Sequence, residues 1–186
     1  MNVGFALTGS FCTYSRVFPV LELLSRDYTV TPIFSRAAWE TDSRFGTGAD
    51  HIREARELCG TEPIHTIPQA EPIGPRKLFD ILVIAPCTGN TLAKLASGIA
   101  DGPVTMAAKS HLRNGRSVLL AISTNDGLGT AAENIGKLLN RKHYYFVPFG
   151  QDDPQEKPNS LVSDFSLLPQ SLEMALEGKQ IQPMLV

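Results

Sequence analysis

The stretch DILVIAPCTGNTLAKLASGIAD, from Asp80 to Asp101, decides the fold of this chain. Its apolar start, Ile81 to Ala85, predicts a buried strand, and Pro86 is expected to end it because proline has no N–H for a sheet ladder. The small polar residues Cys87 to Thr91 predict a tight loop. Apolar residues then recur at the spacing of one helix face, at Leu92, Leu95, Ala96 and Ile99. The stretch therefore predicts a strand, a loop and a helix, in that order.

The loop of this unit has the composition of a ligand-binding turn. Gly89 allows the backbone to approach a ligand closely, and either Thr88 or Asn90 can cap the helix that follows. The first N–H groups of that helix would then point at whatever lies above the strand end. Ordinary turns of α/β proteins have the same composition, so this loop alone leaves a purely structural role open.

Three further segments repeat the pattern of an apolar run followed by a polar loop. Strands are predicted at Val3 to Leu7, Tyr28 to Phe34 and Arg116 to Ile122, with helical patterns after them. This alternation predicts an α/β fold, a three-layer Rossmann-like or flavodoxin-like parallel sheet with helices on both faces. The 186 residues fit a single domain, 1–186, in which 151–186 form a C-terminal arm and helix.

The loops after these four strands share hydroxyl, amide and glycine side chains. Because the carboxyl ends of parallel strands lie at one edge of a sheet, the loops are expected to line one pocket there. Their composition favours an anionic, hydrogen-bonding ligand such as the phosphate of a nucleotide or a flavin. Neither a GxGxxG fingerprint nor a P-loop occurs. The predicted ligand-binding residues are Thr8, Gly9, Ser10, Ser35, Pro86, Cys87, Thr88, Gly89, Asn90, Thr91, Ser123, Thr124 and Asn125.

Composition excludes several classes of function. The formal net charge of −2 gives no electrostatic footprint for nucleic acid, and no apolar run is long enough to cross a bilayer. The three cysteines lack metal-type spacing, so no metal site is predicted, and their odd number argues against a disulfide framework. No signal peptide is evident at the N-terminus. A reduced, cytoplasmic protein is therefore expected.

The remaining segments give weaker signals. His51 lies among charged residues of a predicted helix and is interpreted as a surface residue, while His65 is a weak catalytic candidate. The proline-rich run from Pro63 to Pro75 predicts a semi-rigid wall or flap beside the pocket. The polar residues Gln151 to Ser160 predict a surface arm, and Leu167 to Leu176 predict a final helix.

The central segment PCTGNTLAKLASGIAD resembles the Pro-Ala-Ser-Ala-Asn-Thr signature of the homo-oligomeric flavin-containing cysteine decarboxylases. Thr8-Gly9-Ser10 resembles the first flavin loop of that family. The resemblance implies that Ser10 and Ser35 hold the phosphate of FMN and that Asn90 contacts the ribityl chain and ring. It also implies that Ser123 to Asn125 complete the pocket and that the chain forms trimers or a multiple of them.

A narrower resemblance covers the whole chain. The start TGSFCTYSRVFP, the loop AISTNDGLG and the tail QDDPQEKPNSLVSDF resemble the B subunits of dipicolinate synthase, a branch of the same superfamily. This resemblance implies a cytoplasmic protein of the mother cell of a sporulating bacterium. It also implies a partner, the A subunit of that enzyme, which binds NADP, and a joint reaction that oxidises a dihydrodipicolinate-type compound to pyridine-2,6-dicarboxylate.

One departure from the decarboxylases separates the possible functions. Those enzymes carry a catalytic His about eight residues before the Asp that opens the central strand, and Pro72 stands there in this sequence. No catalytic residue is therefore assigned, and Cys87 is interpreted as a structural residue of the loop. Three functions stay open: a flavin-binding subunit of dipicolinate synthase, a decarboxylase of the phosphopantothenoylcysteine type, and a stabilising subunit without flavin.

Overall fold

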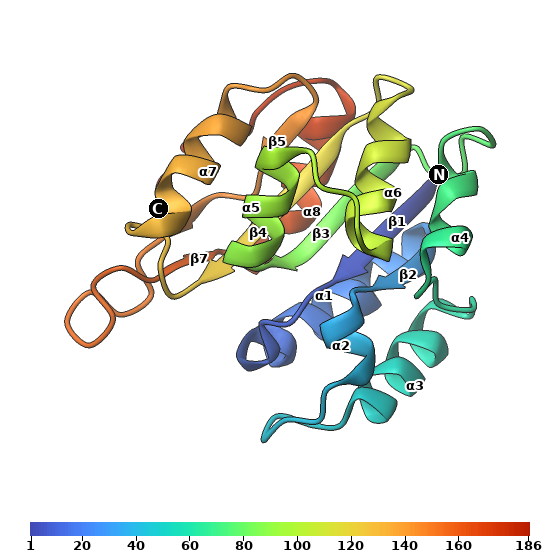
Figure 1. Ribbon diagram of the computed structural model, residues 1–186, viewed down its shortest axis with the longest axis horizontal. Helices are drawn as coiled ribbons and strands as arrows, with labels where there is room; N and C mark the ends of the chain where they lie inside the picture. Colours follow the sequence, from blue (N-terminus) through green and yellow to red (C-terminus); the bar gives the residue numbers. More distant parts are fainter.

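A computed structural model describes residues 1–186, and its central element is a seven-stranded sheet in the order β2-β1-β3-β4-β7-β6, with β5 also paired to β4 (Figure 1). Strands β1, β2, β3, β4 and β5 are parallel, whereas β7 runs antiparallel to β4 and β6. The strands are β1 (Asn2–Leu7), β2 (Thr29–Phe34), β3 (Ile81–Cys87), β4 (Val118–Thr124), β5 (Tyr144–Phe146), β6 (Phe149–Gly150) and β7 (Leu161–Ser163).

Eight α-helices cover the two faces of the sheet (Figure 1). They are α1 (Tyr14–Asp27), α2 (Arg36–Glu40), α3 (Gly48–Cys59), α4 (Ile67–Ala70), α5 (Gly89–Ser97), α6 (Pro103–Leu112), α7 (Thr130–Leu139) and α8 (Leu168–Leu176). Three short 3-10 turns are η1 (Phe11–Thr13), η2 (Glu71–Ile73) and η3 (Phe165–Leu167). None of the helices has the length and apolarity that crossing a membrane requires.

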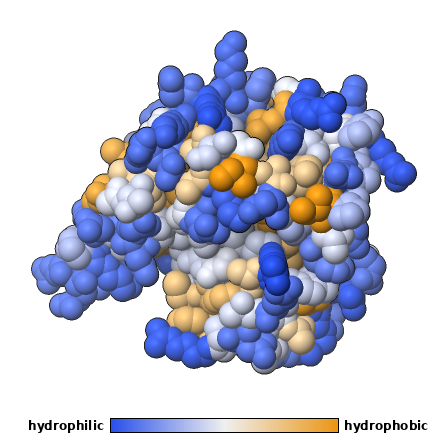
Figure 2. All heavy atoms as spheres, in the orientation of Figure 1, coloured by the Kyte–Doolittle hydropathy of each residue, from blue (hydrophilic) through white to orange (hydrophobic).

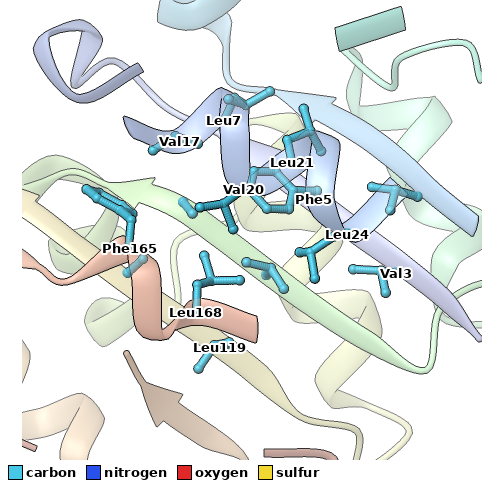
Figure 3. Close-up of a cluster of buried hydrophobic side chains, with 14 of the residues drawn as sticks. Val3, Phe5, Leu7, Val17, Val20, Leu21, Leu24, Leu119, Phe165 and Leu168 are labelled. Carbon is cyan, nitrogen blue, oxygen red and sulfur yellow. The ribbon is translucent and has the colours of Figure 1, made fainter. Parts of the chain in front are cut away.

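The core lies in two layers, one on each face of the sheet. Alternate residues of a strand point to opposite faces, so Val3, Phe5 and Leu7 of β1 enter one layer while Ala6 enters the other. The first layer packs against α1, α3 and α8, and Figure 3 shows Leu21 of α1 near Phe5 of β1 and Leu168 of α8 near Leu119 of β4. The second layer packs against α5, α6 and α7. The predicted three-layer α/β fold is confirmed.

Two boundaries of the central unit differ from the predictions. Strand β3 continues through Pro86 to Cys87, with an irregular register against β4 between Ile84 and Cys87. That irregularity accommodates a residue without an N–H inside a central strand. Helix α5 ends at Ser97 because Gly98 takes a left-handed φ of 71°. Ile99 therefore lies beyond the helix and is 46% exposed, so its predicted place on the buried helix face is wrong.

The proline-rich segment packs against a helix instead of forming a flap. Ile64 pairs with Ile33 at the sheet margin, and the short helix α4 and turn η2 pack against α6. A Cβ on Gly74 would lie 2.6 Å from the Ser110 carbonyl oxygen, so this packing is close. None of the residues from Thr61 to Lys77 lines a cavity at the carboxyl edge of the sheet. The expected wall or flap beside the pocket is therefore wrong.

His51 is buried, which corrects its interpretation as a surface residue. Its side chain is 5% exposed, and its Nε2 lies 3.3 Å from the carbonyl oxygen of Phe45. The ring centroid of Tyr14 lies 4.7 Å from that of His51 in an edge-on arrangement. Only every third or fourth residue of α3 is buried, namely Gly48, His51 and Ala55. Because charged residues stand between these positions, the sequence pattern alone does not reveal the buried face of this helix.

Candidate ligand site at the carboxyl edge of the sheet

The strand order changes direction between β1 and β3. Strand β2 lies beside β1 on one side of this point, and β4 lies beside β3 on the other side. Such a switch point opens a crevice at the carboxyl ends of the strands. Hydrogen bonds there connect the loop after β1 to the end of β3 and the loop that follows it. Thr8 Oγ1 donates to the carbonyl oxygen of Pro86 at 2.6 Å, and the Thr88 N–H donates to Thr8 Oγ1 at 3.3 Å.

The amino end of α5 lies at this switch point. Thr88 caps the helix, because its Oγ1 accepts a hydrogen bond from the Thr91 N–H at 3.2 Å. The N–H groups of Gly89 and Asn90 belong to the first helical turn, which has no intrahelical acceptors for them. A Cβ on Gly89 would lie 2.7 Å from Thr124 Oγ1, so the loop after β4 closes tightly over this turn. The start of α5 therefore offers N–H donors without intrahelical acceptors, in close contact with the loop after β4.

A first cavity of about 700 Å³ opens above β1, β2 and β3. Three helices begin at it, since the α2 cap Ser35, the α5 cap Thr88 and the α6 cap Gly102 line its wall. Ion pairs flank it: Lys94 Nζ lies 2.9 Å from Asp101 Oδ1, and Arg36 Nε lies 2.9 Å from Glu40 Oε2. Lys94 lowers the pKa of Asp101 below its usual value through this hydrogen bond. The predicted residues that line the cavity are Thr8, Gly9, Ser35, Thr88, Asn90 and Thr91.

A second cavity of about 340 Å³ adjoins the first, since Gly9 and Thr88 line both. Ser10 Oγ and Ser123 Oγ are 2.6 Å apart and join the loops after β1 and β4. Two aromatic residues, Phe11 and Phe45, supply the apolar part of the lining. The predicted residues that line this cavity are Gly9, Ser10, Thr88, Gly89, Ser123, Thr124 and Asn125.

The structure thus gathers the predicted residues at one edge but around two cavities. Ser35 lines the first and Ser10 the second, so the two serines do not share a cavity. Pro86 and Cys87 line neither; Cys87 is fully buried, and burial raises the pKa of its thiol, which therefore stays protonated. Ser35 has a capping role, because its Oγ accepts a hydrogen bond from the Ala38 N–H at 3.1 Å.

Two groups of site residues were missed from the sequence. One is the start of α6, Gly102 to Thr105, where Pro103 at the first helical position marks a helix start but does not show that this helix begins at the site. The other is the aromatic pair Phe11 and Phe45. Nothing in the sequence near Phe45 shows that its loop folds back onto the loop after β1.

Comparison with known proteins agrees with this architecture. The family model described as Flavoprotein matches residues 1–157. The chain belongs to the flavoprotein family. It is 49% identical to the B subunit of dipicolinate synthase from Bacillus subtilis (strain 168), a match that covers 100% of this chain and 93% of that relative.

Solved structures of flavoprotein-family relatives share the fold. The crystal structure of the dipicolinate synthase B subunit from Bacillus halodurans C matches with a TM-score of 0.91 and 45% identity, covering 100% of this chain and 95% of that one. The FMN-dependent cysteine decarboxylase SpaF matches with a TM-score of 0.70 and 21% identity, covering 94% of this chain and 97% of that one. The predicted resemblance to dipicolinate synthase B subunits within this family is confirmed.

The residues at the switch point fit a flavin mononucleotide. The first cavity offers hydroxyl, amide and first-turn N–H donors, the groups that bind phosphate in proteins. The second cavity offers the faces of aromatic residues, which suit a flat ring. Their volumes fall within or near the range of about 300–1,000 Å³ that is usual for small-molecule sites.

Proposed function

We propose that this chain is the B subunit of a dipicolinate synthase and binds FMN, or a similar phosphate-bearing ligand, at the switch point between β1 and β3. The observation that carries the proposal is the pair of adjoining cavities at the start of α5, in a chain that resembles the B subunit of dipicolinate synthase over its full length. The joint reaction would be oxidation of a dihydrodipicolinate-type compound to pyridine-2,6-dicarboxylate during sporulation.

The two cavities would bind different parts of the ligand, the first its phosphate and the second its ring. Ser35 Oγ and the N–H group of Asn90 would hold the phosphate in the first cavity, close to the positive end of the α5 dipole. Phe11 and Phe45 would exclude water from the ring in the second cavity. A bound flavin supplies hydride or electron transfer, and the protein supplies its orientation and electrostatic environment.

A second protein would bind the nicotinamide cofactor. This chain lacks the GxGxxG loop that holds a dinucleotide pyrophosphate, so NADP would bind to the A subunit of the enzyme. The decarboxylase alternative has no support at the site. Pro72, which stands where those enzymes carry a His, lies in η2 against α6 and lines neither cavity. We expect no carbon dioxide release from phosphopantothenoylcysteine, and release above the rate without protein would restore this alternative.

Ligand binding is tested by titrating the purified chain into FMN and, separately, into riboflavin, with flavin fluorescence as the measurement. The proposal predicts that FMN binds at least tenfold more tightly, because riboflavin lacks the phosphate that the first cavity would hold. Equal affinity for both flavins would show that the phosphate site is wrong. A chain that binds neither flavin would favour the stabilising subunit without flavin.

The enzymatic role is tested by reconstitution with the A subunit of the enzyme. Dipicolinate formation is measured with that partner on its own, with this chain added, and with this chain and FMN added. The proposal predicts the highest rate for the complete mixture. The same rate in all three mixtures would remove the reason to assign this chain to the enzyme.

A further inference from the structure

A third cavity, here called the basic cavity, lies away from the loops that carry the proposed flavin site. It has a volume of about 590 Å³ and lies where α5 and α6 end and β5 begins. Thr105 is its one residue in common with the first cavity. Figure 2 shows this face of the molecule, on which hydrophobic patches lie among hydrophilic side chains over α5 and α6. The function proposed above makes no use of this cavity.

The basic cavity collects positive side chains that form no ion pair. Nine of the 17 Lys and Arg side chains form ion pairs, which leaves eight unpaired. Four of those eight, half of the total, line this one cavity: Lys109, Arg113, Arg141 and Lys142. No Asp or Glu lines it. The negative ends of the α5 and α6 dipoles allow these cations to gather without acidic partners.

The floor of the basic cavity is apolar and partly preorganised. Leu95, Leu112 and Tyr144 line it together with Ile99, which is 46% exposed. Arg141 is fixed at its rim, because its Nη1 and Nη2 donate to the carbonyl oxygens of Leu95 and Ala96 at 3.0 and 2.7 Å. Three of the five guanidinium N–H groups remain for another acceptor.

These features define the chemistry of an occupant. An apolar floor surrounded by a few convergent polar groups, with a volume within about 300–1,000 Å³, is typical of small-molecule sites. Four cations without acidic partners favour an occupant with more than one negative charge. We propose that the basic cavity binds a small organic dianion with an apolar body, such as an aromatic dicarboxylate or an aryl phosphate. This inference does not rest on the proposed flavin site.

The experiment uses the full chain and isothermal titration calorimetry at low salt. One series of titrations uses pyridine-2,6-dicarboxylate and the other uses phenyl phosphate. Comparing the two shows whether the cavity prefers a dicarboxylate or a phosphate. Benzoate and inorganic phosphate serve as comparators that lack the second charge or the apolar body. We expect at least one of the two dianions to bind at least tenfold more tightly than both comparators.

Variants locate the binding. Lys109→Gln with Arg113→Gln removes two exposed cations of the basic cavity, and Arg76→Gln removes an exposed, unpaired cation that lines none of the cavities described. The double variant should weaken dianion binding at least tenfold, and Arg76→Gln should change it by less than twofold. Both proteins should retain the circular dichroism spectrum of the parent and its response to FMN.

Two results would overturn the inference. One is the absence of heat from both dianions at millimolar concentration in a parent protein that shows a native circular dichroism spectrum. The other is an unchanged affinity in the double variant, which would place the bound dianion elsewhere. The FMN titration is independent of either result, so failure of this inference and failure of the proposed function can be told apart.

Discussion

Gly89 is the residue at which the proposed site should be most sensitive to one added atom. A Cβ there would lie 2.7 Å from Thr124 Oγ1 and 2.9 Å from Asp126 Oδ1, two side chains that are hydrogen-bonded to each other. Gly89→Ala should therefore shift these two side chains, break their hydrogen bond and lower the free energy of unfolding by about 1 kcal/mol. FMN affinity should fall roughly tenfold, measured by fluorescence titration.

Gly136 provides the matched control for that substitution. It also lies in a helix, α7, but a Cβ there would meet no atom within 4 Å. Gly136→Ala should raise the free energy of unfolding by about 0.5–1 kcal/mol and leave FMN binding unchanged. If both substitutions had the same effect on FMN binding, the tight closure over the start of α5 would be irrelevant to the ligand.

His111 should make stability depend on pH. Its side chain is 1% exposed, its Nε2–H donates to the Ser117 carbonyl oxygen at 3.0 Å, and burial lowers its pKa to about 4. The unfolded chain, with a His pKa of about 6.5, binds more protons than the folded chain between these two values. The free energy of unfolding should therefore fall as the pH drops from about 6.5 to 4, by on the order of 3 kcal/mol.

Chemical denaturation of the parent and of His111→Gln across that pH range measures this effect. The variant should have lower stability at pH 7 and a flatter dependence on pH, because it has lost the titrating group. An equally steep decline in both proteins would assign the pH dependence to other groups.

Individual residues were predicted well where local chemistry sets their role and poorly where tertiary contacts do. Thr88 caps α5 as its sequence position suggests, whereas Cys87, predicted in the ligand-binding loop, is the last residue of β3 and lines neither cavity. His51 was misplaced because its burial depends on α1 and the loop that carries Phe45, which are distant in sequence. Pro86 was misplaced because a bulge, which no local pattern encodes, admits it to the sheet.

Among the elements, the C-terminal segment is where sequence analysis fell furthest short. The polar arm and final helix were predicted, but strand β7 was not, because its three residues are too few to show a period. It pairs with Ser123 and Thr124 of β4 and so supports the loop at the proposed site. Helix α8 places Leu168 and Leu172, both fully buried, in the core layer beside α1.

Truncation after Phe149 should therefore unfold the chain rather than only weaken its assembly. It removes several buried apolar side chains, each worth about 2–5 kcal/mol when deleted to Ala, against a total stability of about 5–15 kcal/mol. Replacing the exposed residues 154–157 with Gly and Ser is the control and should preserve the fold. Circular dichroism and FMN titration of both variants test this, and a folded, flavin-binding truncation would contradict it.

At the scale of the whole molecule, the alternation of strands and helices was enough to predict the three layers, whereas the division of the site into two cavities was not. The two cavities meet at Gly9 and Thr88, in the loops after β1 and β3 that Thr8 connects through hydrogen bonds. We expect the chain to form a trimer or a multiple of it, as its resemblance to the homo-oligomeric flavin family implies. Multi-angle light scattering measures the mass, and a monomer at micromolar concentration would contradict the expectation.

The proposed function depends above all on a phosphate-bearing flavin at the switch point between β1 and β3. A crystal structure of the chain grown with FMN is the decisive experiment. We expect phosphate density in the first cavity, within hydrogen-bond reach of Ser35 and the first turn of α5, and ring density beside Phe11 and Phe45. Flavin density at any other place, or both cavities filled only by water at saturating FMN, would show that the proposed site is wrong.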